Sequence, residues 1–256
     1  MKNNSHKKSQ FKSMHVKHSF TGNQLTSFAG LSPIMKYLNR LKIGQSLNNL
    51  FPTVMYNATK FTNAQVLLSV VLASLAGINR LQRIAAFTHD ALVKPLLGLD
   101  TGLNKDVIST RLKALGQAGS FMLQEHLFAL VTNFLRKCQL AKITLDADST
   151  VKTVYGNQQG AEKGYNPHKH GAKSYHPVLA FVSEIKYVVN SWFRCGSAYT
   201  SNGICEFIKQ TKALLPPNVR RVFFRADSGF FNGALFDLLE SYHWTYLVKV
   251  KLKNLK

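Results

Sequence analysis

The hexapeptide LDADST, residues 145–150, ends a segment in which apolar and polar side chains alternate from Ile143 onward. Alternation with a period of two is typical of a β-strand with one buried face. Asp146 and Asp148 both fall on the polar face, in a chain that has 12 acidic residues against 33 lysines and arginines. Because aspartate has a low strand propensity, two of these scarce carboxylates on one strand indicate a site.

The residues after position 141 predict an α/β domain. Further strands are expected at 174–184, 187–196, 220–228 and 244–252, and helices at 202–216 and 229–243. Only the short link EIK separates the second strand from the third, which favours a hairpin. This order of strands and helices predicts a mixed sheet flanked by helices.

Residues 21–140 predict an all-helical N-terminal domain that contacts DNA. Apolar residues recur at helical spacing in the segments 30–43, 66–78, 103–119 and 121–137. The most apolar run, 66–78, has 13 residues, whereas a membrane span needs about 20, so a buried core helix is expected. Residues 1–20 are basic and polar without the apolar centre of a signal peptide, and they predict a flexible arm.

The charge of the chain predicts a polyanionic partner. The formal charge is +21 and the isoelectric point about 10.0, which favours nucleic acid bound with counterion release. A membrane surface or solubility alone are the alternatives, although no basic amphipathic helix with a lipid-facing side stands out. Cys138, Cys195 and Cys205 lack C-x-x-C spacing, so neither a disulfide framework nor a zinc site is indicated, and a reducing compartment is expected.

A third candidate acid, Asp227, ends the predicted strand 220–228. Carboxylates that converge from strand ends about 4 Å apart repel by roughly 4 kcal/mol at an effective dielectric constant of 20. A hard divalent ion such as Mg²⁺ removes this repulsion, and two ions about 3.5–4 Å apart support in-line phosphodiester displacement. For Asp146 or Asp227 taken alone, capping of a turn or pairing with a lysine stays an open alternative.

Two longer motifs carry a family resemblance. LDADSTVKTVYGNQQGAEKGYNP (145–167) and RADSGFF (225–231), with LTSFAGL (25–31) before a helical region, resemble the DDE transposases of bacterial insertion sequences, in the group 1 branch of the DDE domain. The resemblance extends from about Leu25 to Val250. It implies a ribonuclease H-like catalytic domain at residues 141–256, in which two aspartates and a glutamate bind two Mg²⁺ or Mn²⁺ ions. These ions support hydrolysis at the element ends and attack of the freed 3′-hydroxyl on target DNA.

The resemblance also assigns the site residues. The first acid matches Asp148 and the second Asp227, while the role of Asp146 stays open. The glutamate lies well beyond the second aspartate in the family, and Asp237 and Glu240 are too close to Asp227 to match it. A C-terminally truncated transposase of the bacterial cytoplasm, associated with the nucleoid, is therefore expected.

The missing glutamate leaves other functions open. One alternative is a catalytically inactive DNA-binding remnant that occupies element ends, or that inhibits a full-length transposase by associating with it. Another is a structure-selective nuclease on a similar fold. A homodimer is also compatible with the resemblance.

The segment between the two acids predicts contacts to DNA. Lys163, Lys169 and Lys173 are interleaved with Tyr165 and Tyr175 in what is interpreted as a solvated basic loop near phosphate. Arg225 shares a strand face with Asp227 and is expected either to contact the DNA backbone or to pair with a carboxylate. In the same loop His168, His170 and His176 raise the alternative of a transition-metal site.

Overall fold

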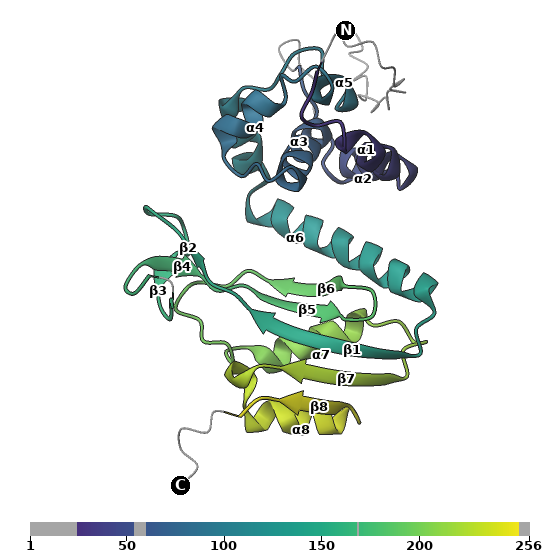
Figure 1. Ribbon diagram of the computed structural model, residues 1–256, viewed down its shortest axis with the longest axis vertical. Coiled ribbons are helices and arrows are strands. Elements are labelled where there is room, and N and C mark those ends of the chain that lie inside the picture. The colour runs from purple at the N-terminus through teal and green to yellow at the C-terminus, as the bar shows by residue number, and fades with distance from the viewer. Residues whose placement is uncertain (1–24, 54–59, 168, 251–256) are drawn as a thin grey trace, which may run out of the picture. The chain divides into compact units, whose positions relative to one another are not determined.

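The computed structural model describes residues 25–53, 60–167 and 169–250 (Figure 1). The arm expected at residues 1–20 lies outside this part of the chain. The chain divides into two compact units, Met1–Gln124 and Glu125–Lys256. The division falls inside a long helix, before the boundary at residue 140 that the sequence suggests, because Val131 and Leu135 of this helix belong to the core of the second unit.

The first unit is helical in its described residues. Its elements are α1 (Leu31–Arg40), α2 (Ile43–Leu50), α3 (Asn63–Leu75), α4 (Leu81–Phe87), α5 (Val93–Leu96) and the first half of α6 (Lys105–Cys138). Helix α3 corresponds to the apolar run of the sequence, and its Leu68 and Leu72 are fully buried. The side chain of Thr62 accepts from the backbone of Gln65 and the Gln65 side chain accepts in return, a capping box that starts α3. The run is therefore a buried core helix, and among the described residues no helix has the length and apolarity to cross a membrane.

Helix α6 is interrupted at Gly116, whose φ of 55° and ψ of −157° are not helical. A positive φ is accessible to glycine without the steric cost that a side chain would add. The sequence predicts two helices here, 103–119 and 121–137. The interruption at Gly116 explains why the apolar positions of the two segments do not follow one continuous helical period.

Within the described residues of the second unit, five strands form a mixed sheet in the order β6-β5-β1-β7-β8. These strands are β1 (Lys142–Ser149), β5 (Val178–Val182), β6 (Tyr187–Trp192), β7 (Arg221–Ala226) and β8 (Thr245–Val248). Strand β1 pairs antiparallel with β5, which forms the predicted hairpin with β6, and it pairs parallel with β7 on its other side. Strand β8 extends the parallel part beyond β7. This arrangement is a ribonuclease H-like fold.

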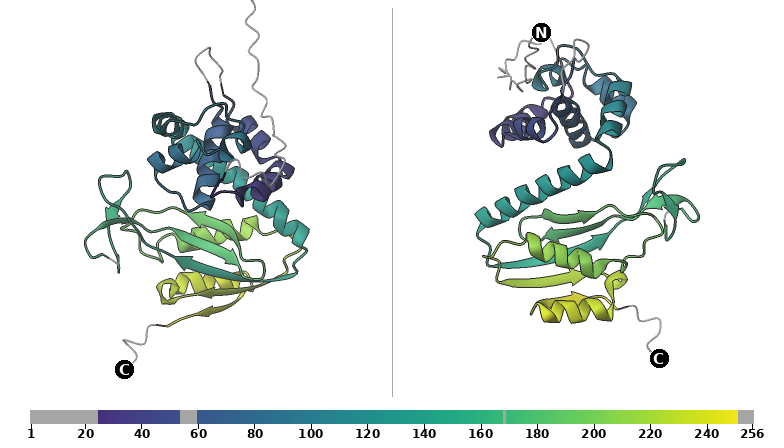
Figure 2. Two further views of the ribbon diagram at one scale, coloured as in Figure 1. Left: turned by 45° about the horizontal axis from the view of Figure 1, so that its top comes forward. Right: turned by 180° about the vertical axis from the view of Figure 1, so that it is seen from behind.

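Helices α7 (Ile204–Leu214) and α8 (Gly233–Ser241) both cover one face of this sheet, as the view from behind in Figure 2 shows. The core on this face is made by fully buried side chains such as Leu145, Phe207 and Phe224. The alternation in β1 follows from this covering, because its apolar side chains face the helices. The opposite face carries the acidic residues of β1.

A smaller sheet lies mostly where the sequence predicts a loop. Strands β2 (Lys152–Thr153), β3 (Glu162–Lys163) and β4 (Lys173–Tyr175) form a sheet in the order β2-β4-β3. We call residues 150–176 the ribbon. The interpretation as a solvated loop is wrong for the strand residues 152–153, 162–163 and 173, because their backbones pair in antiparallel register. Ser174 and Tyr175 belong to the strand expected at 174–184, which the structure divides into β4 and β5.

Candidate active site at the ends of β1 and β7

Asp148 and Asp227 lie next to each other at the same edge of the sheet. In the parallel pairing of β1 with β7, Ala147 is the Cα partner of Ala226, and the two aspartates are the next residues along each strand. Neighbouring strands are about 4.8 Å apart. Both aspartates are exposed and follow buried or half-buried alanines, so both belong to the face that α7 and α8 leave open. The parallel register thus brings the two predicted acids together.

Each carboxylate is oriented by its own backbone. Asp148 Oδ1 accepts a hydrogen bond from Ser149 N at 2.8 Å, and Asp227 Oδ1 accepts one from Gly229 N at 2.9 Å. Asp227 also caps the short 3-10 helix η1 (Ser228–Phe230). In the described part of the chain the second oxygen of each carboxylate has no hydrogen-bond partner, which leaves it available to a ligand.

The donor set fits a hard divalent cation. Magnesium binds oxygen ligands and commonly uses one or two carboxylates together with water and substrate phosphate. Asp148 and Asp227 supply two carboxylates from neighbouring strand ends. No third acidic, histidine or cysteine side chain joins them among the residues that the structure describes.

Asp146 and Arg225 form a salt bridge on the same face. They are Cα partners across β1 and β7. Arg225 Nε donates to Asp146 Oδ1 at 2.6 Å, and Nη2 donates to Oδ2 at 2.8 Å and to Ser183 Oγ at 3.2 Å. This hydrogen bonding raises the pKa of Arg225 above its ordinary value. Of the two roles left open for Arg225, pairing with a carboxylate is the one present in the structure.

The loop after β6 reaches the two acidic ends. Thr200 Oγ1 lies 3.1 Å from Ser149 Oγ, next to Asp148. A Cβ atom placed on Gly229, next to Asp227, would lie 3.1 Å both from Thr200 and from the Asp227 carboxylate. Thr200 therefore sits beside both acids, and nothing in the sequence pattern of this loop indicates that position.

Arg194 holds this loop in place. Its Nη1 donates to the carbonyl oxygens of Tyr199, Thr200 and Asn202 at 3.2, 3.3 and 2.9 Å, and its Nε donates to the carbonyl of His176 at 3.0 Å. Burial lowers the pKa of the Arg194 guanidinium. Sequence reasoning missed this residue, because an arginine just after a strand has no local signature of a structural role.

The three predicted DNA-contacting lysines all lie on the ribbon. Lys163 and Lys173 are Cα partners in β3 and β4. Lys169 follows β3 in the chain, with its Nζ 4.7 Å from the centroid of the Tyr155 ring. The ribbon continues directly from the end of β1, so these lysines belong to the segment that leaves Asp148.

The histidines of the ribbon do not form a metal site in the described residues. His176 is buried, and its Nδ1 lies 2.6 Å from the carbonyl oxygen of Ala198, which fixes it within the fold. His168 lies outside the described residues. The alternative of a transition-metal site has no support among the residues that the structure describes.

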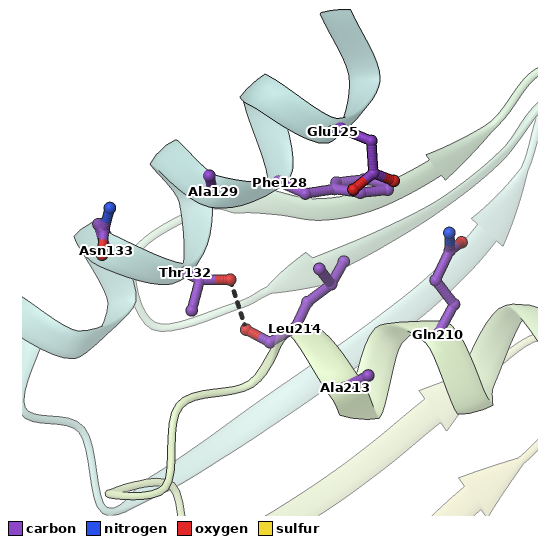
Figure 3. A pocket seen from close by; sticks show the side chains of 8 residues that line it. All are labelled: Glu125, Phe128, Ala129, Thr132, Asn133, Gln210, Ala213 and Leu214. Carbon is purple, nitrogen blue, oxygen red and sulfur yellow. Dashed lines mark hydrogen bonds between the residues drawn. The ribbon is translucent and has the colours of Figure 1, made fainter. Parts of the chain in front are cut away.

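A hollow of about 370 Å³ lies elsewhere in the second unit, between α6 and α7 (Figure 3). Its lining residues are Glu125, Phe128, Ala129, Thr132, Asn133, Gln210, Ala213 and Leu214. The Thr132 hydroxyl donates to the Leu214 carbonyl at 3.0 Å between the two helices. The hollow contains neither candidate acid, so it is separate from the site at β1 and β7.

Comparisons with known proteins place the chain in a family. The family model described as transposase DDE domain group 1 matches residues 8–255. No match was found among curated proteins. Among solved structures, the piggyBac transposase synaptic complex with hairpin DNA is similar, with 16% identity and a TM-score of 0.43 over 83% of this chain and 48% of that chain.

Two further structures are similar at lower scores. The Mos1 transposase paired-end complex has 10% identity and a TM-score of 0.31, over 87% of this chain and 78% of that one. The Drosophila P element transposase strand transfer complex has 10% identity and a TM-score of 0.36, over 82% and 47%. The chain spans about half the length of the piggyBac transposase chain. Because the family model matches nearly the whole sequence, the chain belongs to the transposase DDE domain group 1 family.

Proposed function

We propose that this chain acts in DNA transposition, with Asp148 and Asp227 as the metal-binding acids of metal-dependent DNA cleavage and strand transfer. The observation that carries the proposal is the parallel register of β1 and β7, in which the partners Ala147 and Ala226 are followed by the two aspartates. Two carboxylates in this position repel each other, and a bound cation would offset that repulsion. An insertion sequence in the bacterial cytoplasm is the substrate that this proposal implies.

Asp148 and Asp227 would hold Mg²⁺ or Mn²⁺ through the oxygens that their backbone hydrogen bonds leave available. Once bound, such ions activate the attacking oxygen and stabilise the leaving oxygen of an in-line phosphodiester displacement. The chain's own contribution is to fix the two carboxylates in advance, so that no rearrangement is needed when the ion binds. Thr200, on the loop after β6, lies against Ser149 and Gly229, which are close to the two acids in the chain.

The lysines of the ribbon would hold the DNA. Lys163, Lys169 and Lys173 are exposed or half-buried cations on the segment that follows β1. Contacts between lysine and phosphate position a duplex without reading its sequence. Such contacts release counterions, so binding should weaken steeply as salt is raised.

A second candidate function is DNA binding without cleavage, either alone or together with another transposase chain. The observation that favours it is that no third carboxylate joins Asp148 and Asp227 within the described residues. Fewer ligands should weaken ion binding and leave its geometry less constrained. Binding of DNA needs only the cationic surface, so it would persist.

The decisive experiment is a titration with Mn²⁺, followed by the loss of the free-ion electron paramagnetic resonance signal. We expect Asp148→Asn and Asp227→Asn each to weaken binding at least tenfold, whereas Asp237→Asn, an exposed aspartate on α8, should leave it unchanged. Unchanged binding in both site variants would show that no metal site exists at β1 and β7.

A nicking assay then separates the two candidate functions. If the chain nicks DNA that contains the element end in Mn²⁺, and Asp227→Asn abolishes this, the cleavage function is supported. If Mn²⁺ and DNA both bind but no nicking occurs, the chain is a binding protein.

A further inference from the structure

The ribbon presents a single cationic face. Lys152 is the Cα partner of Tyr175, and Lys163 is the partner of Lys173. Directly paired residues of antiparallel strands share a face, and so do residues two apart on one strand. Lys152, Lys163, Lys173 and Tyr175 therefore lie on the same face of the small sheet.

The acid of the ribbon is on the other face. Glu162 is the Cα partner of Ser174, which alternates with Lys173 and Tyr175, and its carboxylate accepts a hydrogen bond from Ser197. Lys173 Nζ donates to Asn157 Oδ1 at 2.9 Å, a neutral partner that leaves the lysine charge uncompensated. Like charges directly opposite on neighbouring strands destabilise a sheet. The Lys163–Lys173 pairing is therefore unfavourable for the isolated ribbon and favourable for a bound polyanion.

An exposed aromatic ring stands on this cationic face. Phe193 follows β6 and is 71% exposed. Its ring packs on that of Tyr175, with centroids 4.5 Å apart and planes at 40°. The Tyr175 hydroxyl donates to the carbonyl of Gln159 at 2.7 Å, which anchors the supporting ring. Phe193 is thus held in place while most of its surface is open to solvent.

The face is also fixed to the acidic site. Thr150, which follows β1, donates its N–H to the carbonyl of Pro177, the residue before β5. A Cβ atom on Gly164 or on Gly196 would come closer than 3.0 Å to backbone atoms of the other segment, so the ribbon also packs closely against the loop after β6. The ribbon is therefore tied to the main sheet by a backbone hydrogen bond beside the end of β1 and by a close contact with the loop after β6.

We propose that Lys152, Lys163, Lys173 and Phe193 bind an unpaired nucleotide of a DNA strand beside the acids. The lysines would contact its phosphates and Phe193 would stack on its base. Inside a duplex, away from its two ends, both faces of a base are covered by neighbouring bases, so there only a base released from the helix can stack on Phe193. The proposal rests on the proposed function, since it takes DNA as the partner, and it adds which form of DNA this surface selects.

The test measures DNA binding by fluorescence anisotropy in EDTA, so that it does not depend on the metal site. Three labelled probes are compared: a 12-nucleotide single strand, a duplex of the same sequence, and that duplex with a four-nucleotide 3′ extension. Phe193→Leu keeps an apolar side chain but removes the stacking ring. Phe121→Leu, at a phenylalanine on α6 that is 58% exposed, is the matched control.

We expect Phe193→Leu to weaken binding of the single strand and of the extended duplex about tenfold, because stacking of one base on an aromatic ring contributes on this scale. Binding of the plain duplex should change less than twofold. Phe193→Trp should restore the preference for unpaired DNA. Replacing Lys152, Lys163 and Lys173 by glutamine should weaken binding of all three probes. It should also reduce, by about 2, the steepness with which the logarithm of the single-strand binding constant falls against the logarithm of salt concentration.

Two results would overturn the proposal. One is that Phe193→Leu changes the affinity for all three probes by the same factor. The other is that Phe121→Leu lowers the affinity for unpaired DNA as much as Phe193→Leu does. If Mn²⁺ binding failed at Asp148 and Asp227 while this preference for unpaired DNA held, the proposed catalytic function would fall and the nucleotide site would stand. If Mn²⁺ bound at the two aspartates but the preference for unpaired DNA were absent, the nucleotide site would fall and the proposed catalytic function would stand.

Discussion

The carboxylate of Asp146 and the guanidinium of Arg225 are joined across β1 and β7 by two hydrogen bonds of 2.6 and 2.8 Å. Both residues lie two positions before the candidate acids on the same strands and the same face. This distance along a strand is about 7 Å. The pair therefore places one positive and one negative charge close to the proposed metal site, and its hydrogen bonds engage both carboxylate oxygens of Asp146.

Removing this positive charge should strengthen metal binding. We expect Arg225→Gln to raise the Mn²⁺ affinity about fivefold, because a unit charge about 7 Å away repels a divalent cation even in a water-like dielectric. Asp146→Asn should lower the affinity by a similar factor, and the double variant should return close to the starting value. Metal titration in low salt measures all three. If Arg225→Gln instead weakened binding as much as Asp227→Asn, the pair would act by positioning the strands.

Loss of the Arg194 side chain should release the loop that carries Thr200. Arg194→Met removes the donors to three loop carbonyls, and we expect a loss of unfolding free energy on the order of 2 kcal/mol. Limited proteolysis should then cut between residues 198 and 203, and urea denaturation gives the stability. Arg220→Met, at an exposed arginine before β7, is the control and should change neither. An intact loop in Arg194→Met would show that other contacts hold it.

A side chain at Gly196 should destabilise the ribbon. A Cβ atom there would come closer than 3.0 Å to the carbonyl oxygens of Glu162 and Ser174, so backbone must move. We expect Gly196→Ala to cost about 1–3 kcal/mol, as overpacking does, with faster proteolysis of residues 155–170. Gly233→Ala, at the start of α8, meets nothing within 4 Å and should be neutral. Equal stability of the two variants would contradict the close contact.

The thiol of Cys205 should report on folding of the second unit. Burial raises its pKa, the carboxylate of Glu206 adds to this effect, and Lys209 opposes it. A raised pKa means that the folded state favours the neutral thiol. This contribution to stability is complete below the pKa of the unfolded thiol and is lost as the pH rises through the folded value.

Alkylation by iodoacetamide at pH 8, read by peptide mass spectrometry, should accordingly be slower in the native chain than in guanidinium. The difference should narrow as the pH is raised. Equal rates at pH 8 would contradict the shift. The same measurement checks that the site variants are folded.

The parts that sequence predicts best are those with a long and regular pattern. The alternation from Ile143 predicts β1 and its acidic face, and the covering of the other face by α7 and α8 explains it. The hairpin of β5 with β6 follows from the short link between two apolar runs. Asp227 could be placed at a strand end because β7 keeps the same period.

The ribbon and the register could not be predicted in this way. Strands β2 and β3 have two residues each, too few to show a period, so the segment resembles a loop in sequence. Whether Arg225 pairs with a carboxylate or is available to DNA depends on the residue opposite it on the neighbouring strand. That residue is Asp146, and the pairing of β1 with β7 is not visible in the sequence. Arg194 and Thr200 act through contacts between segments far apart in sequence.

Because Lys163 and Lys173 lie opposite each other, salt should have opposite effects on the stability of the free ribbon and on its affinity for nucleic acid. Added salt screens their mutual repulsion and steadies the free protein in this region. The same ions compete with nucleic acid for the lysines and dissociate the complex. A buffer chosen for a well-ordered ribbon would thus be a poor one for observing its ligand, and crystals grown from concentrated salt would favour the empty form.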